Sequence, residues 1–325
     1  MENKLYTKDE VKTFILQGRV MLLAGSPRAL EGLPAGKWIA GSTVYFIDKV
    51  GLKDEERIFV YDFTNIAKDV FLEVFDENNI NKIAFNSFET GFTLLTIPMD
   101  TLVLENFSKN SLSYDGIFDY PVAGFVAGVD IEKIGVEKSV VVSGMDGKLL
   151  YDKAAVMHVK LSNDYYVHSE ILNFDEIEPD SPEIVFPKTS YVQSSCSIDG
   201  KQGNIANLFG TLPFERQKLV QNQCGALINR ESVLINSLKK EVQFYAPVVA
   251  GEKYRLGRKR ENYIDGFNKK LNTKNNVLLC LSCIIYYLHG DFEGKKFSYN
   301  CIITYGEIAY QLLNKTVVTV EVEKI

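Results

Sequence analysis

The sequence predicts an α+β, or mixed α/β, fold in which two β-rich halves carry helices packed on their sheets. Three observations predict this class: a β-α-β pattern near the start, a series of strand-like runs in the first half, and an ordered C-terminal tail. With 325 residues, of which 46% are hydrophobic, the chain can bury a large core. That length suits one large domain or two medium domains.

The opening pattern joins a helix, a buried strand and a second, short helix. Residues 7–10, Thr-Lys-Asp-Glu, form a capping box that predicts a helix start. The apolar residues 20–24 predict a buried strand, and Ser26 and Pro27 are the cap and the first position of the second helix. Strand-like runs follow at 39–47, 57–63, 70–75, 92–97 and 122–129. The N-terminal half is therefore expected to be β-rich.

Two alternating segments, 155–161 and 165–171, predict a hairpin around a three-residue loop. This register would place His158 opposite His168, about 5 Å apart at Cβ. Such a pair could ligate a metal or a haem iron, or form a pH-sensitive hinge. The alternative is two histidines on the polar face of a solvent-lined hairpin. Because the sequence places no third ligand beside them, we predict no metal site.

An acidic stretch with two prolines, 173–182, is the predicted boundary between an N-terminal half, 1–175, and a C-terminal half, 184–325. In the second half, Tyr263, Phe267 and Leu271 stand at helical spacing and predict an amphipathic helix. The apolar run 277–288 predicts a buried strand or a core helix.

The C-terminal tail combines a strand at 301–304, a short helix that Gly306 admits, and a closing strand from Thr316. Glu307 would stand in the first turn of the helix, where the helix dipole favours a carboxylate. Ile308 and Leu312 would form its apolar face. The tail is therefore expected to be a core element.

The tail resembles the C-terminal part of FIST domains, bacterial sensory modules named for F-box and intracellular signal transduction. The matching residues are Tyr-Gly-Glu-Ile at 305–308, Asn314-x-Thr316, and the apolar strand 278–283 that ends in cysteine. Residues 38–43 are similar to the small-residue turn of the family. Where many members have an arginine soon after the cysteine, this chain has Ile-Ile-Tyr-Tyr at 284–287. The chain is identified as a divergent, stand-alone member of an uncharacterised bacterial subgroup.

The resemblance implies a sensory protein whose ligand is amino-acid-like, or is haem if the protein is a gas sensor. Cys283, Cys301 and Glu307 would meet if the strands 278–283 and 301–304 pair, and they could line a ligand pocket. Glu307 would best suit an ammonium group. The predicted ligand-binding residues are Gly41, Ser42, Thr43, Cys283, Cys301, Tyr305, Gly306, Glu307, Asn314 and Thr316. The alternative is that Gly41 turns the chain while Asn314 and Thr316 cap and start elements.

A second hypothesis is an enzyme with a cysteine nucleophile, Cys283 or Cys301, that acts on a small carbonyl compound. Such a thiol needs access and a lowered pKa. Cys280-x-x-Cys283 has the spacing of redox or zinc sites, but it lies inside an apolar run with no second cysteine pair. We therefore favour a binding protein over an enzyme, with no cofactor predicted.

Charge and hydropathy exclude several classes of protein. The net charge of −6 argues against a nucleic-acid partner, and the basic residues within 253–260 alternate with other types, which predicts a solvated loop. The longest apolar run has about 12 residues, too few for a bilayer that needs about 20. We expect a cytoplasmic protein without an output domain. A small ligand would favour one arrangement of its halves, and a separate signalling protein would recognise that arrangement.

Overall fold

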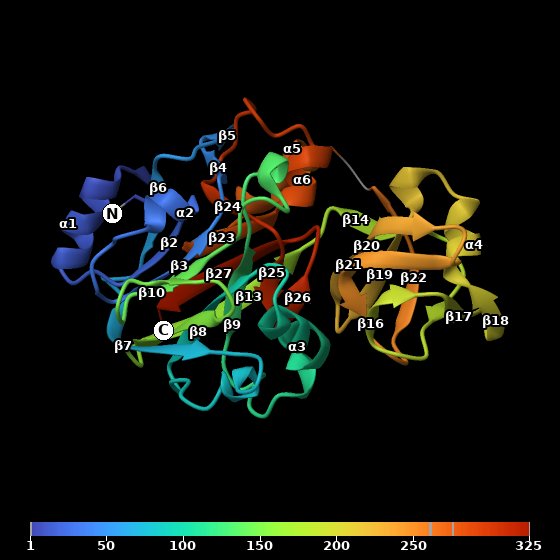
Figure 1. The fold of residues 1–325 in the computed structure, drawn as a ribbon, viewed down its shortest axis with the longest axis horizontal. Helices are drawn as coiled ribbons and strands as arrows, with labels where there is room; N and C mark the ends of the chain where they lie inside the picture. Colours follow the sequence, from blue (N-terminus) through green and yellow to red (C-terminus); the bar gives the residue numbers. More distant parts are fainter. Residues whose placement is uncertain (1, 260–261, 275, 325) are drawn as a thin grey trace.

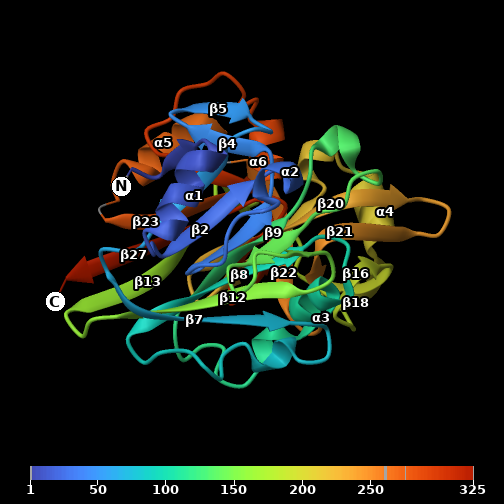
Figure 2. The same ribbon diagram turned by 60° about the vertical axis from the view of Figure 1, so that its left-hand side comes forward.

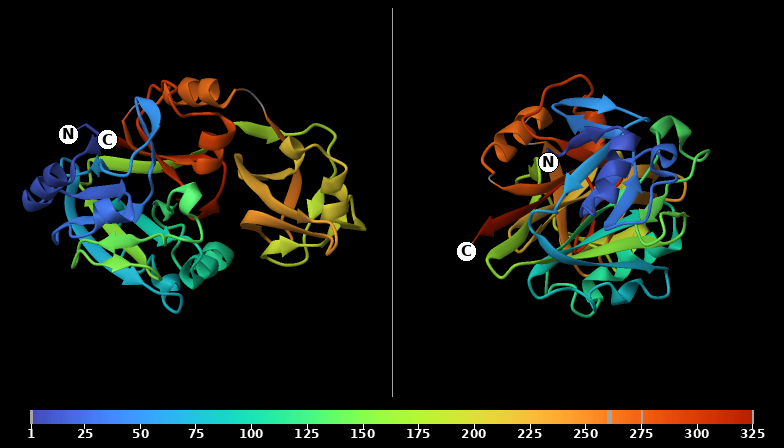
Figure 3. Two further views of the ribbon diagram at one scale, coloured as in Figure 1. Left: turned by 45° about the horizontal axis from the view of Figure 1, so that its top comes forward. Right: turned by 90° about the vertical axis from the view of Figure 1, so that its left-hand side faces the viewer.

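A computed structural model describes residues 2–259, 262–274 and 276–324 and shows two lobes of unequal size (Figure 1). The small lobe consists of residues 175–259, and the large lobe consists of the described residues before and after it. The chain leaves the large lobe after β13 (Tyr165–Leu172) and returns to it at α5 (Tyr263–Leu271). The two lobes lie side by side (Figure 3).

Three six-stranded sheets form the large lobe within the described residues. In spatial order, the first sheet contains β1 (Lys4–Tyr6), β6 (Ile58–Asp62), β2 (Met21–Gly25), β3 (Trp38–Ser42), β10 (Val141–Ser143) and β11 (Leu149–Leu150). The second contains β26 (Gln311–Leu313), β25 (Glu307–Ala309), β9 (Val122–Ala127), β8 (Gly91–Pro98), β12 (Ala154–Leu161) and β7 (Ala67–Phe75). The third contains β13, β27 (Val317–Lys324), β23 (Val277–Cys283), β24 (Cys301–Thr304), β4 (Tyr45–Asp48) and β5 (Val50–Lys53).

Strands from both ends of the chain pair with each other in the second and third sheets. β25 pairs with β9, and β24 pairs with β4, so the C-terminal tail is built into the sheets of the first half. One core joins the three sheets, because Leu22, Met157 and Val318 belong to the same buried cluster. The predicted halves, 1–175 and 184–325, therefore share two of the three sheets.

The small lobe has its own sheet and its own core. Its strands are β14 (Asp175–Ile177), β15 (Ile184–Val185), β16 (Ser190–Gln193), β17 (Ser195–Ile198), β18 (Lys201–Asn204), β19 (Lys218–Gln223), β20 (Ala226–Asn236), β21 (Glu241–Val248) and β22 (Lys253–Lys259). Phe186 and Tyr254 are buried in its core together with Phe209 of α4 (Ile205–Gly210). The basic run predicted as a solvated loop is strand β22, and Arg260 at its end lies outside the described residues.

The predicted α+β class, with helices packed on the sheets, is wrong, because strands make up 46% of the chain and helices 17%. The described residues also form helices α1 (Lys8–Leu16), α2 (Pro27–Leu30), α3 (Leu102–Asn110) and α6 (Ile284–His289), besides four short 3₁₀ turns at 80–82, 111–113, 131–133 and 214–216. No helix in the described parts of the chain is longer than nine residues. Most connections between strands are therefore turns and loops.

The opening elements follow the sequence prediction. The Thr7 hydroxyl accepts a hydrogen bond from the Glu10 amide, and the Glu10 carboxylate accepts one from the Thr7 amide, at 3.4 and 2.8 Å. Ser26 caps α2, and β2 and β3 are parallel, which confirms the β-α-β unit. Figure 2 shows α1 beside β2, where Val11 and Ile15 are buried.

The helix predicted in the tail is wrong, because residues 307–313 form the hairpin of β25 and β26. Ile308 and Leu312 are directly opposite each other across this hairpin. A spacing of four residues thus brings two apolar side chains together across a tight turn, just as it would along a helix. Tyr310 stands at the turn with a φ of 61°.

Candidate functional site

Three of the predicted ligand-binding residues, Cys283, Glu307 and Thr316, meet in the interior of the large lobe. β23 and β24 are parallel neighbours, so the condition on which Cys283 and Glu307 would meet is fulfilled, and Cys283 lies near Glu307. The Glu307 carboxylate is fully buried and accepts hydrogen bonds from the hydroxyls of Thr304 and Thr316, at 2.9 and 2.7 Å, and from the Thr316 amide at 3.2 Å. The Cys283 thiol also donates to it. This carboxylate is satisfied within the protein and faces no solvent.

Burial raises the pKa of Glu307 to about 8, although the donors from Thr316, Thr304 and Cys283 act in the opposite direction. A carboxyl group without a cationic partner is costly to ionise in an apolar interior. The group therefore carries a proton for much of the time at neutral pH, which does not suit the predicted contact with an ammonium ligand.

The two candidate nucleophiles are buried thiols. Burial, followed by the nearby Glu307 carboxylate, raises the pKa of Cys283 well above its usual value. Burial and the neighbouring Cys280 do the same for the pKa of Cys301, whose thiol donates to the Cys280 carbonyl at 3.1 Å. An activated thiol needs access and a lowered pKa. Cys224 is the exposed cysteine of the described chain.

The predicted turn residues Gly41, Ser42 and Thr43 fix strands to one another. The Ser42 hydroxyl donates to the Gly128 carbonyl at 2.7 Å, and the Thr43 hydroxyl donates to the Ile303 carbonyl at 2.8 Å. A Cβ at Gly41 would lie 2.6 Å from a ring carbon of Phe125. Gly306 is similarly confined, since a Cβ there would lie 2.8 Å from Leu312. All four positions serve close packing.

The two histidines do not face each other. β12 pairs with β7 and β8, while β13 pairs with β27, so the predicted hairpin between them does not form. The buried His158 ring bonds to the Thr93 hydroxyl and the Glu73 carboxylate, at 2.8 and 3.0 Å. The partly exposed His168 lies opposite Glu321. The parts of the chain that the structure describes contain no group of three or more His, Cys, Asp or Glu side chains placed to hold a metal.

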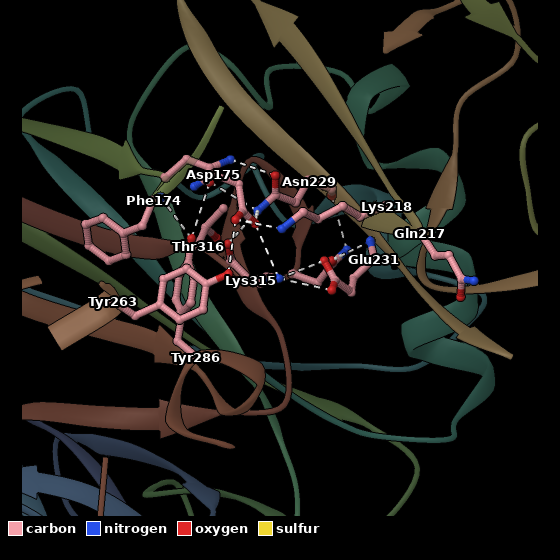
Figure 4. A network of polar contacts seen from close by, with 12 residues as sticks. Phe174, Asp175, Gln217, Lys218, Asn229, Glu231, Tyr263, Tyr286, Lys315 and Thr316 are labelled. Atoms are coloured by element: carbon pink, nitrogen blue, oxygen red, sulfur yellow. Dashed lines mark hydrogen bonds and ion pairs between the residues drawn. The ribbon is translucent and has the colours of Figure 1, made fainter. Parts of the chain in front are cut away.

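A buried network of charges lies where the two lobes meet (Figure 4). It contains two carboxylates, Asp175 and Glu231, and two ammonium groups, Lys218 and Lys315, all at most 6% exposed. Lys218 Nζ lies 2.7 Å from Asp175 Oδ1. Lys315 Nζ lies 3.0 and 3.1 Å from the Glu231 oxygens and 3.4 Å from Asp175 Oδ2. The four charges sum to zero.

Neutral side chains complete this junction network. The Tyr263 hydroxyl donates to Asp175 at 3.1 Å, and the Asn229 side chain donates to Asp175 at 3.3 Å and to the Lys315 carbonyl at 2.8 Å. Asp175, Lys218, Asn229 and Glu231 come from the small lobe, whereas Lys315 and Tyr263 come from the large lobe. The network therefore holds the two lobes together.

The two lysines of the junction network differ in basicity. Burial lowers the pKa of Lys218. The attraction of Asp175 opposes this shift, and the repulsion from Lys315 cancels part of that attraction. Burial also opposes the charge on Lys315, but Glu231 and Asp175 outweigh it and raise its pKa. Lys315, which contacts both carboxylates, is thus the central cation of the network.

Further polar contacts join the tail hairpin to the small lobe. The side-chain oxygen of Asn314 accepts from the Glu231 amide at 3.0 Å, and its nitrogen donates to the Asn229 carbonyl at 3.2 Å. The fully buried Arg230 guanidinium donates to Gln311 at 3.0 Å. Asn314, predicted as a ligand contact, is therefore a contact between the lobes.

Sequence reasoning missed the junction network. Asp175 belongs to the acidic stretch that predicts a boundary, and Lys315 lies between Asn314 and Thr316, which are predicted ligand-binding residues. A signal was present in the small lobe. Lys218 and Glu231 stand in strand-forming sequences close to apolar residues, Leu219 and Val220 for the first and Ile228 for the second. Charged residues at such positions need partners.

A cavity of about 690 Å³ lies between the lobes and is called the interlobe cavity here. Met99, Leu104 and Tyr305 line it from the large lobe, and Tyr191 and Tyr245 line it from the small lobe. The Tyr305 hydroxyl is held by the Val129 carbonyl, and the Tyr191 hydroxyl donates to Ser108 at 2.7 Å. Among the predicted ligand-binding residues, only Tyr305 is a lining residue of this cavity.

The interlobe cavity adjoins the junction network. Burial, and then the neighbouring Cys283 and Glu231, raise the pKa of Tyr245, whose ring lines the cavity. The charged side chains on the described walls are the carboxylates of Asp100 and Glu105. The cavity thus combines apolar walls, tyrosine hydroxyls and negative charge.

Within the described residues, the helices are too short or too polar to cross a membrane.

Comparison with known proteins corrects the family assignment. No curated protein matches the chain. The resemblance to FIST domains is wrong, because the family model that matches is a different one and covers nearly the whole chain. The phrase that carried the resemblance, 305–308, spans the end of a loop and the start of β25, where no helix follows. The match covers residues 6–323, and the chain belongs to a family of unknown function (DUF6976).

Proposed function

We propose that the protein binds a small molecule in the interlobe cavity and that binding favours one arrangement of the two lobes. The observation that carries this proposal is the cavity itself: about 690 Å³, with tyrosines from both lobes on its walls. Ligand sites are typically 300–1,000 Å³, mostly apolar with a few polar groups, and often lie between domains. A ligand that touches both lobes shifts their equilibrium by its different affinities for the two arrangements.

The walls narrow the chemical class of the ligand. Met99, Val126 and Leu312 offer apolar surface, and Asp100 attracts a cation and repels an anion, while Glu105 is paired with Lys109 on the same helix. An aromatic or aliphatic amine fits both features, because its ring or chain can lie against the apolar wall while its ammonium group faces a carboxylate. The carboxylate of a complete α-amino acid finds no cationic side chain on the described walls. The proposed ligand is therefore an amine that lacks a carboxylate.

A sensory role follows from this site as part of the proposal. The chain would respond to the amine in the cytoplasm, and a separate signalling protein would recognise the surface that the bound arrangement presents. The free cysteines of the described chain are compatible with a reducing compartment, since none is paired in a disulfide.

The test compares an amine with its uncharged analogue. Isothermal titration calorimetry with phenethylamine is expected to show binding, while 2-phenylethanol, which has a hydroxyl in place of the ammonium group, should bind about tenfold more weakly. Equal affinity for the two compounds would remove the charge argument. Binding of neither, together with a native mass spectrum free of any bound molecule, would reject the proposed site.

Two tyrosine variants localise the binding. Tyr245→Ala removes a ring that is 48% exposed in the cavity, and Tyr151→Ala removes a ring of the same exposure outside it. We expect a loss of about three- to tenfold in affinity for the first variant and no change for the second. Both should unfold at nearly the wild-type temperature. If the two variants behave alike, the ligand lies elsewhere.

A further inference from the structure

A second cavity, of about 620 Å³, lies on the large lobe and shares no lining residue with the interlobe cavity. One wall is the sheet-edge strand β13, with Tyr166 and His168. The other walls are the turn before β8, the loop at 118–121, and Tyr310 at the tip of the tail hairpin. We call it the aromatic groove. The proposed function does not involve this groove.

Two pairs of rings form the surfaces of the aromatic groove. Tyr166 and His168 are stacked with centroids 6.0 Å apart and planes 24° apart, and Phe118 and Tyr310 lie 5.6 Å apart at 34°. Phe118 is 60% exposed and Tyr166 is 57% exposed. Exposed apolar surface gathered in one concave place is typical of binding sites. The stacked pair and the tilted pair both offer ring faces to a ligand.

The left-handed backbone conformation of Tyr310 indicates that its ring is needed at this position. A φ of 61° is rare for an aromatic residue and costs on the order of 1 kcal/mol, whereas glycine or asparagine adopts it more easily. The ring is half-buried and packs against two of the buried clusters of the large lobe as well as Phe118. Strain of this kind is often found at functional sites. The position therefore keeps a ring where the turn alone would favour a smaller residue.

The polar groups of the aromatic groove are acceptors and amides. Glu89, Asp119 and Asn163 are exposed and line it, and no lysine or arginine is among the described lining residues. Carboxylate oxygens accept two hydroxyl hydrogen bonds, and an amide both donates and accepts. An anionic ligand such as a phosphate would be repelled. The groove thus suits a neutral ligand rich in hydroxyl groups.

We propose that the aromatic groove binds a neutral oligosaccharide. A pyranose ring has an apolar face of C–H groups, which can stack on an aromatic ring, and a rim of hydroxyls, which can donate to Glu89 and Asp119. Two ring pairs on separate walls allow two or more sugar units to be held at once. Aromatic rings with carboxylates also suit a quaternary ammonium group. Three separate polar side chains favour a ligand with many hydroxyls over one with a single charge.

The test uses three trisaccharides, maltotriose, cellotriose and tri-N-acetylchitotriose, in saturation-transfer NMR and calorimetry on the full chain, with choline as the cationic probe. At least one trisaccharide is expected to receive saturation from the protein at its C–H positions and to bind in calorimetry. If no trisaccharide binds, the proposal is overturned. If choline binds and the sugars do not, the groove is a cation site and the proposal is likewise overturned.

Variants assign the binding to the aromatic groove. Tyr166→Ala and Asp119→Asn should each weaken sugar binding about tenfold, while Tyr151→Ala and Tyr245→Ala leave it unchanged. Because Tyr245 belongs to the interlobe cavity, this pattern separates the present proposal from the proposed function.

Tyr310→Asn separates recognition from a structural role. This change relieves the backbone strain but removes the ring, so sugar affinity should fall about tenfold in a variant that urea unfolding shows to be folded. Unchanged affinity in the variants at 119, 166 and 310 would contradict the proposal even if a sugar binds.

Discussion

Glu307 in the large lobe and Glu231 at the junction of the lobes are both buried glutamates, but their surroundings differ. Glu307 is surrounded by neutral donors, two hydroxyls, an amide and a thiol. Glu231 faces the Lys315 ammonium group at 3.0 and 3.1 Å. Burial raises the pKa of each. Hydrogen bonds alone do not keep a buried carboxylate ionised, whereas a cation that contacts it opposes the cost of burial.

The comparison also separates two kinds of structural cost. A buried ion pair is weak evidence for stability, because desolvation consumes much of the Coulomb energy. Losing one partner of such a pair is strongly destabilising, because the other charge is left buried without compensation. The junction network therefore specifies how the lobes meet, while the Glu307 cluster makes one lobe sensitive to protonation.

The largest effect is expected from Lys315→Met. The change leaves Asp175 and Glu231 with one cation, Lys218, and should destabilise the fold by about 3–5 kcal/mol. The measurement is urea unfolding at neutral pH. Lys148→Met is the control, because Lys148 pairs with Asp146 at the surface and should cost less than about 1 kcal/mol.

A double variant sharpens this prediction. Lys315→Met combined with Glu231→Met removes one charge of each sign, so its cost should fall below the sum of the single costs by more than about 1 kcal/mol. If the costs simply add, the two side chains are not coupled and the network does not act as a unit.

The next effect is a pH dependence that Glu307 introduces. Its pKa rises from 4.5 to about 8 on folding, so the folded state binds the proton more tightly than the unfolded state. The resulting stability is fully present below pH 4.5 and is lost as the pH rises through 8. Between pH 4.5 and pH 7 the loss is about 3 kcal/mol.

Glu307→Gln isolates this contribution, because glutamine resembles the protonated acid and does not titrate. The stability of the variant relative to the wild type should increase by about 3 kcal/mol between pH 4.5 and pH 7, as measured by urea unfolding at each pH. A difference that stays constant with pH would show that Glu307 does not gain its proton on folding.

The sequence allowed prediction where local chemistry decides structure. The capping box at Thr7, the Pro27 helix start and the parallel β2–β3 pair follow from residues within a few positions of each other. The proximity of Cys283 and Glu307 was also predicted, because it needs only the pairing of two strands close in sequence.

The parts of the fold that the sequence did not predict depend on contacts between segments far apart in the chain. β13 pairs with β27, about 150 positions away, and no local pattern distinguishes that partner from the neighbouring β12. The junction network joins Asp175 to Lys315 across a comparable separation. The tail hairpin shows a different limit, because the spacing of Ile308 and Leu312 is compatible with a helix as well as a tight hairpin.

The smallest effect is expected at the thiols that share the interior with Glu307. Cys283 and Cys301 are buried and have raised pKa values, so thiolate at either position is scarce. Maleimide labelling of the native protein, followed by intact mass, should add one label quickly, at Cys224. The four buried cysteines should react roughly a hundredfold more slowly until urea is added, since labelling there needs local opening. Fast labelling of Cys283 in native protein would show an accessible thiolate beside Glu307, and the large lobe would then hold a reactive site where its geometry indicates a closed core.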